Sequence, residues 1–135
     1  MTYAVSGKVI KGRGYGRKIG FPTINIDRRE YKRRNLTIPE GIYAGTATIK
    51  ENGQRLKAGI VIGIKDKRGL PKMEAHLLDF TDVLYGKNVE LSLRKYLRPF
   101  MSFTGEDALK AQIVKDIAQV DDSIDLTSQC MYVAA

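Results

Sequence analysis

The stretch from Gly12 to Asn25 gathers residue types that bind phosphate groups. Arg13, Arg17 and Lys18 supply positive charge among closely spaced glycines. Glycine lets backbone N–H groups approach an anion closely, and the cations supply the countercharge. The glycines are Gly12, Gly14, Gly16 and Gly20. This pattern predicts a loop that binds a polyphosphate.

A Pro-Thr-x-Asn step, which begins at Pro22, closes this stretch. Thr23 and Asn25 lie two residues apart, so in an extended segment they share one face. A hydroxyl and an amide oxygen on one face can both reach a hard cation such as Mg²⁺. The stretch matches neither Gly-x-x-x-x-Gly-Lys-Ser/Thr nor Gly-x-Gly-x-x-Gly. A flexible, soluble glycine-rich hairpin therefore stays open as the alternative.

A second candidate is the pair Glu74 and His76, which share one face of a predicted strand. A carboxylate near a phosphate site can accept the proton of an attacking hydroxyl. A solvent-facing strand surface explains the same spacing equally well. Because His76 is the single histidine of the chain, a zinc site is not expected.

The elements that must position these residues are mainly strands. Alternation of apolar and polar residues predicts strands, and the Asn52-Gly53 step predicts a tight hairpin turn. Near the C-terminus the apolar period becomes helical, and Thr104 with Asp107 resembles a capping box. The expected strands cover 3–11, 41–49, 56–64, 73–80 and 88–96, and the expected helix covers 105–120. Several strands followed by one helix indicate an antiparallel barrel with the helix packed outside.

Length and composition indicate one globular domain of 135 residues. The single cysteine, Cys130, fits a reducing compartment, and no apolar run is long enough to span a membrane. We therefore expect a cytoplasmic protein. The net charge of +8 attracts polyanions, either nucleotides or nucleic acid. The basic run at 28–34 is interpreted most simply as a solvated loop.

Taken in order, these segments resemble the riboflavin kinase (flavokinase) family in its bacterial form. The Gly-Phe-Pro-Thr-Ile-Asn motif that ends at Asn25 is similar to the family's signature. The resemblance covers roughly residues 3 to 120. Its other motifs are Pro39-Glu40-Gly41-Ile42-Tyr43-Ala44, Met73-Glu74-Ala75-His76-Leu77-Leu78-Asp79-Phe80 and Leu97-Arg98-Pro99.

The resemblance implies a closed six-stranded antiparallel Greek-key barrel with one C-terminal α-helix outside. It implies a kinase domain over 1–122, followed by a tail over 123–135. The implied reaction transfers the γ-phosphoryl group of ATP to the ribityl 5′-hydroxyl of riboflavin and gives FMN. Riboflavin and ATP are the implied partners. We further expect a monomer with no nucleic-acid partner and no membrane partner.

The resemblance also implies a role for each matching residue. Glu74 is the expected catalytic carboxylate, and Thr23 and Asn25 are the expected Mg²⁺ ligands. Arg98, Phe100 and Phe103 are expected on the flavin side, where Phe100 stands in place of the family's usual glutamate. The residues expected to bind the nucleotide are Gly12, Gly14, Gly16, Arg17, Lys18, Gly20, Pro22, Thr23 and Asn25.

Two other functions stay open at this point. A small basic barrel can bind single-stranded nucleic acid, although such barrels interleave stacking aromatics with cations. This chain has no tryptophan, and its aromatics are not interleaved with the 28–34 cations. The second alternative is a flavin- or nucleotide-binding module of the same fold without turnover.

Overall fold

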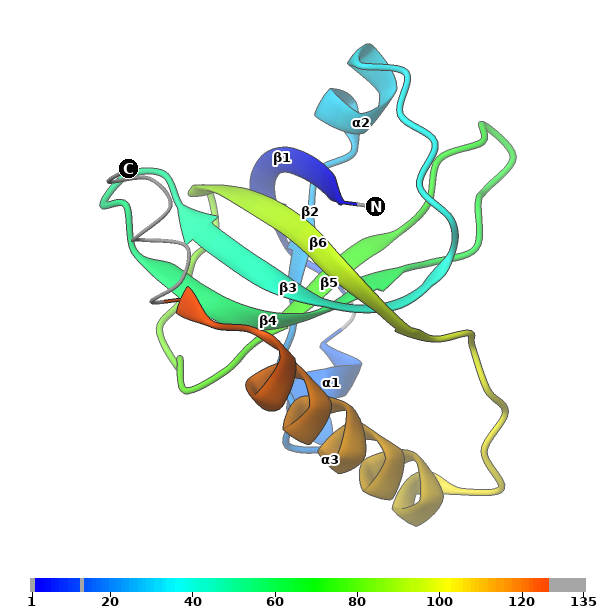
Figure 1. Cartoon of the computed structure of the whole chain (residues 1–135). Coiled ribbons are helices and arrows are strands. Elements are labelled where there is room, and N and C mark those ends of the chain that lie inside the picture. The colour runs from blue at the N-terminus through cyan, green and yellow to red at the C-terminus, as the bar shows by residue number, and fades with distance from the viewer. Residues whose placement is uncertain (1, 13, 127–135) are drawn as a thin grey trace.

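The computed structural model describes residues 2–12 and 14–126, and within them six strands close into an antiparallel barrel. The order around the barrel is β1-β2-β5-β4-β3-β6, and β6 pairs back with β1 (Figure 1). The strands are β1 (Tyr3–Ile10), β2 (Ile24–Ile26), β3 (Gly41–Ile49), β4 (Arg55–Ile62), β5 (Met73–Leu77) and β6 (Asn88–Arg98). The expected mainly-β barrel with a helix outside is therefore confirmed. Cys130 and the rest of 127–135 lie outside the described residues.

The alternation of side chains along each strand separates the core from the outer face. On β4, Ala58, Ile60 and Ile62 are buried inside the barrel. On β5 the buried set is Met73, Ala75 and Leu77, which leaves Glu74 and His76 on the outer face. The polar residues of these strands therefore face away from the core, toward whatever packs outside the barrel.

Three strand ends differ from those expected by two residues or more. β4 ends at Ile62, and Ile64 is 73% exposed instead of continuing the buried face. β5 ends at Leu77 because Asp79 turns the chain in the left-handed region, with a φ of 57°. β6 continues past Tyr96 to Arg98. This extension brings the Arg98 side chain to the edge of the barrel that the C-terminal helix covers.

The expectations for the helical segments needed two corrections. The basic run at 28–34 is not only a solvated loop, because it contains α2 (Arg29–Arg33). Tyr31 of α2 is buried, and its hydroxyl accepts a hydrogen bond from the Ile38 N–H at 3.0 Å. The capping box was also wrong. The long helix α3 (Glu106–Ser123) begins after Gly105 with no side-chain hydrogen bond at its N-cap.

Helix α3 lies across the outside of the barrel and contacts β3, β4 and β6 (Figure 1). Val120 and Ile124 near its C-terminal end are buried against Ala44 and Leu78. A short helix in the glycine-rich segment, α1 (Tyr15–Lys18), lies on the same side (Figure 1). In the described part of the chain, no helix is both long and apolar enough to cross a membrane. The outer wall of the barrel, α1 and α3 thus surround one region.

Candidate functional site

A cavity of about 460 Å³ lies between the outer face of the barrel and helix α3. Strands β4 and β5 provide its floor through residues that alternation turns away from the core, such as Val61 and Glu74. Leu109, Ile113 and Ile117 of α3 form the opposite wall. Because these apolar residues recur at helical spacing, they lie on one face of α3, which lines the cavity and also packs on the barrel.

The candidate cation ligand Asn25 and the candidate base Glu74 lie directly opposite each other. They are paired in register on the antiparallel strands β2 and β5. Residues paired in this way have Cβ atoms about 4.5–5.5 Å apart and project on the same face. Both side chains line the cavity, and so does Thr23, two residues before Asn25. The sheet register therefore brings Glu74, from a distant part of the sequence, to Thr23 and Asn25.

The Asn25 side chain is held in a tight space. A Cβ built on Gly12 would overlap the carboxamide of Asn25, so only glycine allows the backbone this close. Among the described residues, Asn25 Oδ1 is a buried oxygen with no hydrogen-bond partner. An orphaned buried carbonyl oxygen is costly unless a ligand satisfies it. An amide oxygen is a donor that suits Mg²⁺, so this part of the site fits a hard cation.

Glu74 has a cationic neighbour that the sequence interpretation missed. Lys72 Nζ lies 2.8 Å from Glu74 Oε1, and Lys72 also lines the cavity. The Lys72 side chain is 52% exposed and that of Glu74 is 24% exposed. The signal was available, because Lys72, Glu74 and His76 alternate and therefore share one face. The pair gives the cavity wall a carboxylate and an ammonium group side by side.

His76 connects strand β5 to the end of the glycine-rich segment. Its ring Nδ1 lies 2.7 Å from the carbonyl oxygen of Pro22, which can only accept, so Nδ1–H donates. The His76 ring also meets Phe21 edge-on, with 6.2 Å between centroids. Both contacts are adjacent to Thr23. His76 therefore holds the segment that carries Thr23 against the strand that carries Glu74.

Arg98 is held by a carboxylate on helix α3. Its Nε and Nη2 donate to Asp116 Oδ1 and Oδ2 at 2.9 and 2.7 Å, and Gln112 Nε2 donates to Oδ1 at 3.0 Å. The side chains of Arg98 and Asp116 are only 15% and 11% exposed. This two-pronged ion pair joins the end of β6 to α3 and lines the cavity. Asp116 was not among the residues predicted from the sequence.

A second cavity of about 250 Å³ also borders Thr23. It is lined by Arg17, Pro22 and Thr23 from the glycine-rich segment and by the connection after β5, including Phe80 and Tyr85. Thr23 lines both cavities. The two spaces therefore meet at the residue that the sequence analysis assigned to the cation.

Most of the predicted site residues line one or both cavities. The larger cavity is lined by Gly14, Gly16, Thr23, Asn25, Glu74, Arg98, Phe100 and Phe103. Arg17 and Pro22 line the smaller one. Gly12, Lys18 and Gly20 line neither. Gly12 lies against Asn25, while Lys18 and Gly20 are exposed. Arg13 lies outside the described residues.

Comparisons with known proteins agree with this arrangement. The sequence profile of the riboflavin kinase (flavokinase) family matches residues 1–124. The bifunctional riboflavin kinase/FMN adenylyltransferase of Escherichia coli (strain K12) is 35% identical over 122 residues, which cover 84% of this chain and 36% of that protein. The RNA-binding riboflavin kinase RibR of Bacillus subtilis (strain 168) is 35% identical over 126 residues, covering 90% of this chain and 51% of that protein.

A solved structure supports the fold independently. The riboflavin kinase of Trypanosoma brucei superimposes with a TM-score of 0.65 at 21% sequence identity, covering 90% of this chain and 76% of that one. The chain spans about a third of the length of the Escherichia coli relative and about half that of the Bacillus subtilis one. The family profile covers nearly all of the described residues, and the chain belongs to the riboflavin kinase family.

Proposed function

We propose that this chain is an ATP:riboflavin 5′-phosphotransferase, which transfers the γ-phosphoryl group of ATP to the ribityl 5′-hydroxyl and produces FMN. The observation that carries the proposal is the pairing of Asn25 with Glu74 across β2 and β5, on the wall of one cavity. Phosphoryl transfer depends on alignment and on neutralising charge more than on covalent catalysis. A base and a cation ligand on adjacent strands supply both requirements.

The two cavities suggest how the substrates divide. The larger one is bounded by apolar side chains, including Phe100, Phe103 and Ile113, that suit the flat ring system of riboflavin. The smaller one contains Arg17, whose charge suits nucleotide phosphates. Gly14 and Gly16 line the larger cavity and come just before Arg17 in the sequence, so they allow the backbone to approach phosphates that lie between the two cavities. The reacting groups then meet beside Thr23, which both cavities share.

In this arrangement Glu74 acts as the general base. Its carboxylate accepts the proton of the 5′-hydroxyl as the oxygen attacks the γ-phosphorus. Lys72, at 2.8 Å from Glu74, places a positive charge where the negative charge of the transferring group increases. Arg98, fixed by Asp116, lies on the flavin side of the cavity with Phe100 and Phe103.

We further propose that Thr23 and Asn25 hold a Mg²⁺ ion, through the Thr23 hydroxyl and the otherwise unpartnered Asn25 Oδ1. When bound, the ion would neutralise charge on the nucleotide phosphates. Both ligands are uncharged, so we expect the site to fill mainly together with the nucleotide. We also propose a cytoplasmic monomer, because ATP is a cytoplasmic substrate and one chain supplies the residues that line both cavities.

The test is FMN formation from riboflavin, ATP and Mg²⁺, followed by chromatography. Thr23→Val keeps the shape of the side chain and removes its hydroxyl. We expect the KM for Mg²⁺-ATP to rise about tenfold, the effect of one lost ligand interaction of about 1.4 kcal/mol. Riboflavin binding, followed by flavin fluorescence, should change little.

Thr48→Val on β3 is the matched control, since Thr48 lines neither cavity. We expect this variant to retain the kinetic constants of the parent protein. Absence of FMN from the parent protein contradicts the proposed reaction. Equal losses for both substrates in Thr23→Val contradict the metal role of Thr23.

A further inference from the structure

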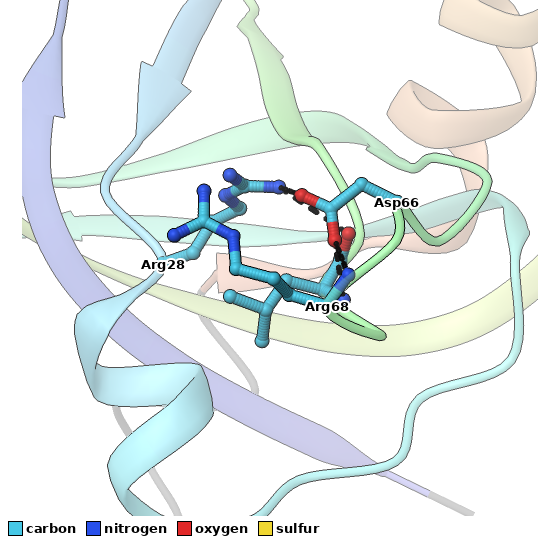
Figure 2. Close-up of polar contacts among 4 residues, drawn as sticks. Arg28, Asp66 and Arg68 are labelled. Carbon is cyan, nitrogen blue, oxygen red and sulfur yellow. Dashed lines mark hydrogen bonds and ion pairs between the residues drawn. The ribbon is translucent and has the colours of Figure 1, made fainter.

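Two segments far apart in sequence are joined on the surface near α2. Arg28 Nη1 donates to Asp66 Oδ2 at 2.7 Å and to the Leu70 carbonyl at 3.3 Å. Figure 2 shows this contact between the segment before α2 and the β4–β5 connection. Arg68, two residues after Asp66, is labelled in the same view on the β4–β5 connection. The residues 27–34 and 63–70 therefore form one continuous surface, called here the basic surface.

Asp66 gives the β4–β5 connection a defined shape. Its Oδ1 accepts hydrogen bonds from the backbone N–H groups of Arg68 and Leu70 at 2.8 and 3.1 Å. The hydrogen bond from Leu70 is the main cause that lowers the pKa of Asp66 below its ordinary value, and Arg28 adds to this effect. Asp66 is therefore ionised at neutral pH, where the contact with Arg28 is retained.

The basic surface carries eight cations and three carboxylates, an excess that accounts for most of the net charge of +8. Each carboxylate already has a cation, because Asp27 pairs with Arg29, Glu30 with Arg33, and Asp66 with Arg28. Among the described residues, the other five cations have no carboxylate within ion-pair distance, and all five are exposed. These five are Lys32, Arg34, Lys65, Lys67 and Arg68.

The kinase site does not use this charge, since none of the eight cations lines either cavity. The basic surface, which the structure describes in full, also lacks the exposed aromatic side chains that bind single-stranded nucleic acid and the group of exposed apolar side chains that inserts into membranes. Its aromatic residue, Tyr31, is buried, so it offers no platform for stacking unpaired bases. Ile64 is its one exposed large apolar side chain in the described part, too little to insert into a lipid surface.

We propose that the basic surface binds the phosphate backbone of duplex nucleic acid, without sequence preference, as a second activity of this kinase. This goes beyond the proposed reaction and does not depend on it. Our expectation of no nucleic-acid partner rested on the absence of interleaved aromatics, which concerns single strands. A duplex is bound through its phosphates instead, and exposed Lys and Arg side chains are sufficient for that.

The number of unpaired cations sets the expected salt dependence. Five phosphate contacts give a slope of about −4.5 for log K against log salt, or a loss of about 500-fold between about 50 and 200 mM salt. The measurement is fluorescence anisotropy of the whole chain with a labelled RNA duplex and a DNA duplex of the same sequence. Comparison of the two affinities shows whether the basic surface prefers the phosphate backbone of RNA or that of DNA.

The test variant is Lys67→Gln/Arg68→Gln, and the control is Lys95→Gln/Lys115→Gln. Both variants lose two exposed positive charges, but the control pair lies outside the basic surface, on β6 and α3. We expect the test variant to reduce the steepness of the salt slope by about 2, and the control to leave it nearly unchanged. FMN formation should be the same in both variants, which shows that they are folded.

Four results overturn this proposal. They are no duplex binding at about 50 mM salt, equal loss in the two variants, tighter binding to single-stranded RNA, and tighter binding to vesicles of anionic phospholipid. Each is measured independently of FMN formation. Failure of the nucleic-acid proposal and failure of the kinase proposal are therefore distinguishable.

Discussion

Replacement of Asp116 by asparagine removes the carboxylate that fixes Arg98, with almost no change in side-chain shape. The guanidinium of Arg98, whose side chain is 15% exposed, would then lose its charge partner and at least one of two hydrogen bonds of 2.7 and 2.9 Å. Breaking a fully buried ion pair on one side costs about 3–5 kcal/mol. An exposed pair contributes about 0–1 kcal/mol. Since this pair opens onto the cavity, we expect about 2–3 kcal/mol of destabilisation.

For a domain of this length, each kcal/mol shifts the Tm by about 4 °C, so Asp116→Asn should lower it by about 8–12 °C. The assay is thermal unfolding by circular dichroism at pH 7. Glu106→Gln is the control on the same helix, because its ion pair with Lys110 is exposed and 3.4 Å long. We expect that control to lower the Tm by about 2 °C at most.

The double variant Arg98→Met/Asp116→Leu distinguishes the loss of a charge partner from a general disruption of packing at this position. Removing both charges together avoids an uncompensated guanidinium, so most of the lost stability should return. An Asp116→Asn protein as stable as the parent refutes a stabilising role for the Arg98–Asp116 ion pair. A double variant that is no more stable than Asp116→Asn refutes that role equally.

Three further predictions follow from the geometry. Gly12→Ala places a methyl group against the Asn25 carboxamide, so the apparent KM for Mg²⁺ should rise while riboflavin affinity in a fluorescence titration stays constant. Lys72→Met should leave the Tm nearly unchanged, since its exposed pair with Glu74 contributes about 0.5 kcal/mol, but should lower kcat/KM about tenfold in the FMN assay. Burial is the main cause that raises the pKa of Tyr43, so the unfolded chain ionises first, near pH 10, and stability present below that pH is lost above it. Urea unfolding should show this loss in the parent protein and a smaller one in Tyr43→Phe.

The residues that alternate along strands were predictable from the sequence. Glu74 and His76 were assigned to one face because a strand has period two, and they do share the outer face of β5. Thr23 and Asn25 were assigned to one face for the same reason, and both line the cavity. Local periodicity determines a face, but it does not say which strands are neighbours. The register that places Asn25 opposite Glu74 is a property of the whole barrel.

Contacts between side chains that are far apart in the sequence were harder to predict. Asp116 lies on the apolar stripe of α3, three residues after Ile113 and four before Val120, where a charged residue requires a buried partner. That signal pointed to an ion pair but not to Arg98. The ion pair between Arg28 and Asp66 could not be predicted from the residues next to either of them in the sequence. The basic run at 28–34 was also interpreted as loop, because its one buried side chain, Tyr31, leaves little helical periodicity.

The most direct test of the proposed chemistry is the single-turnover rate of FMN formation by Glu74→Gln. This change keeps the shape of the side chain and removes its capacity to accept a proton, so we predict a loss of about 10²- to 10⁴-fold. Riboflavin binding, measured in the same protein by fluorescence, should persist. A Glu74→Gln protein that forms FMN at the parental rate contradicts the assignment of the carboxylate opposite Asn25 as the base.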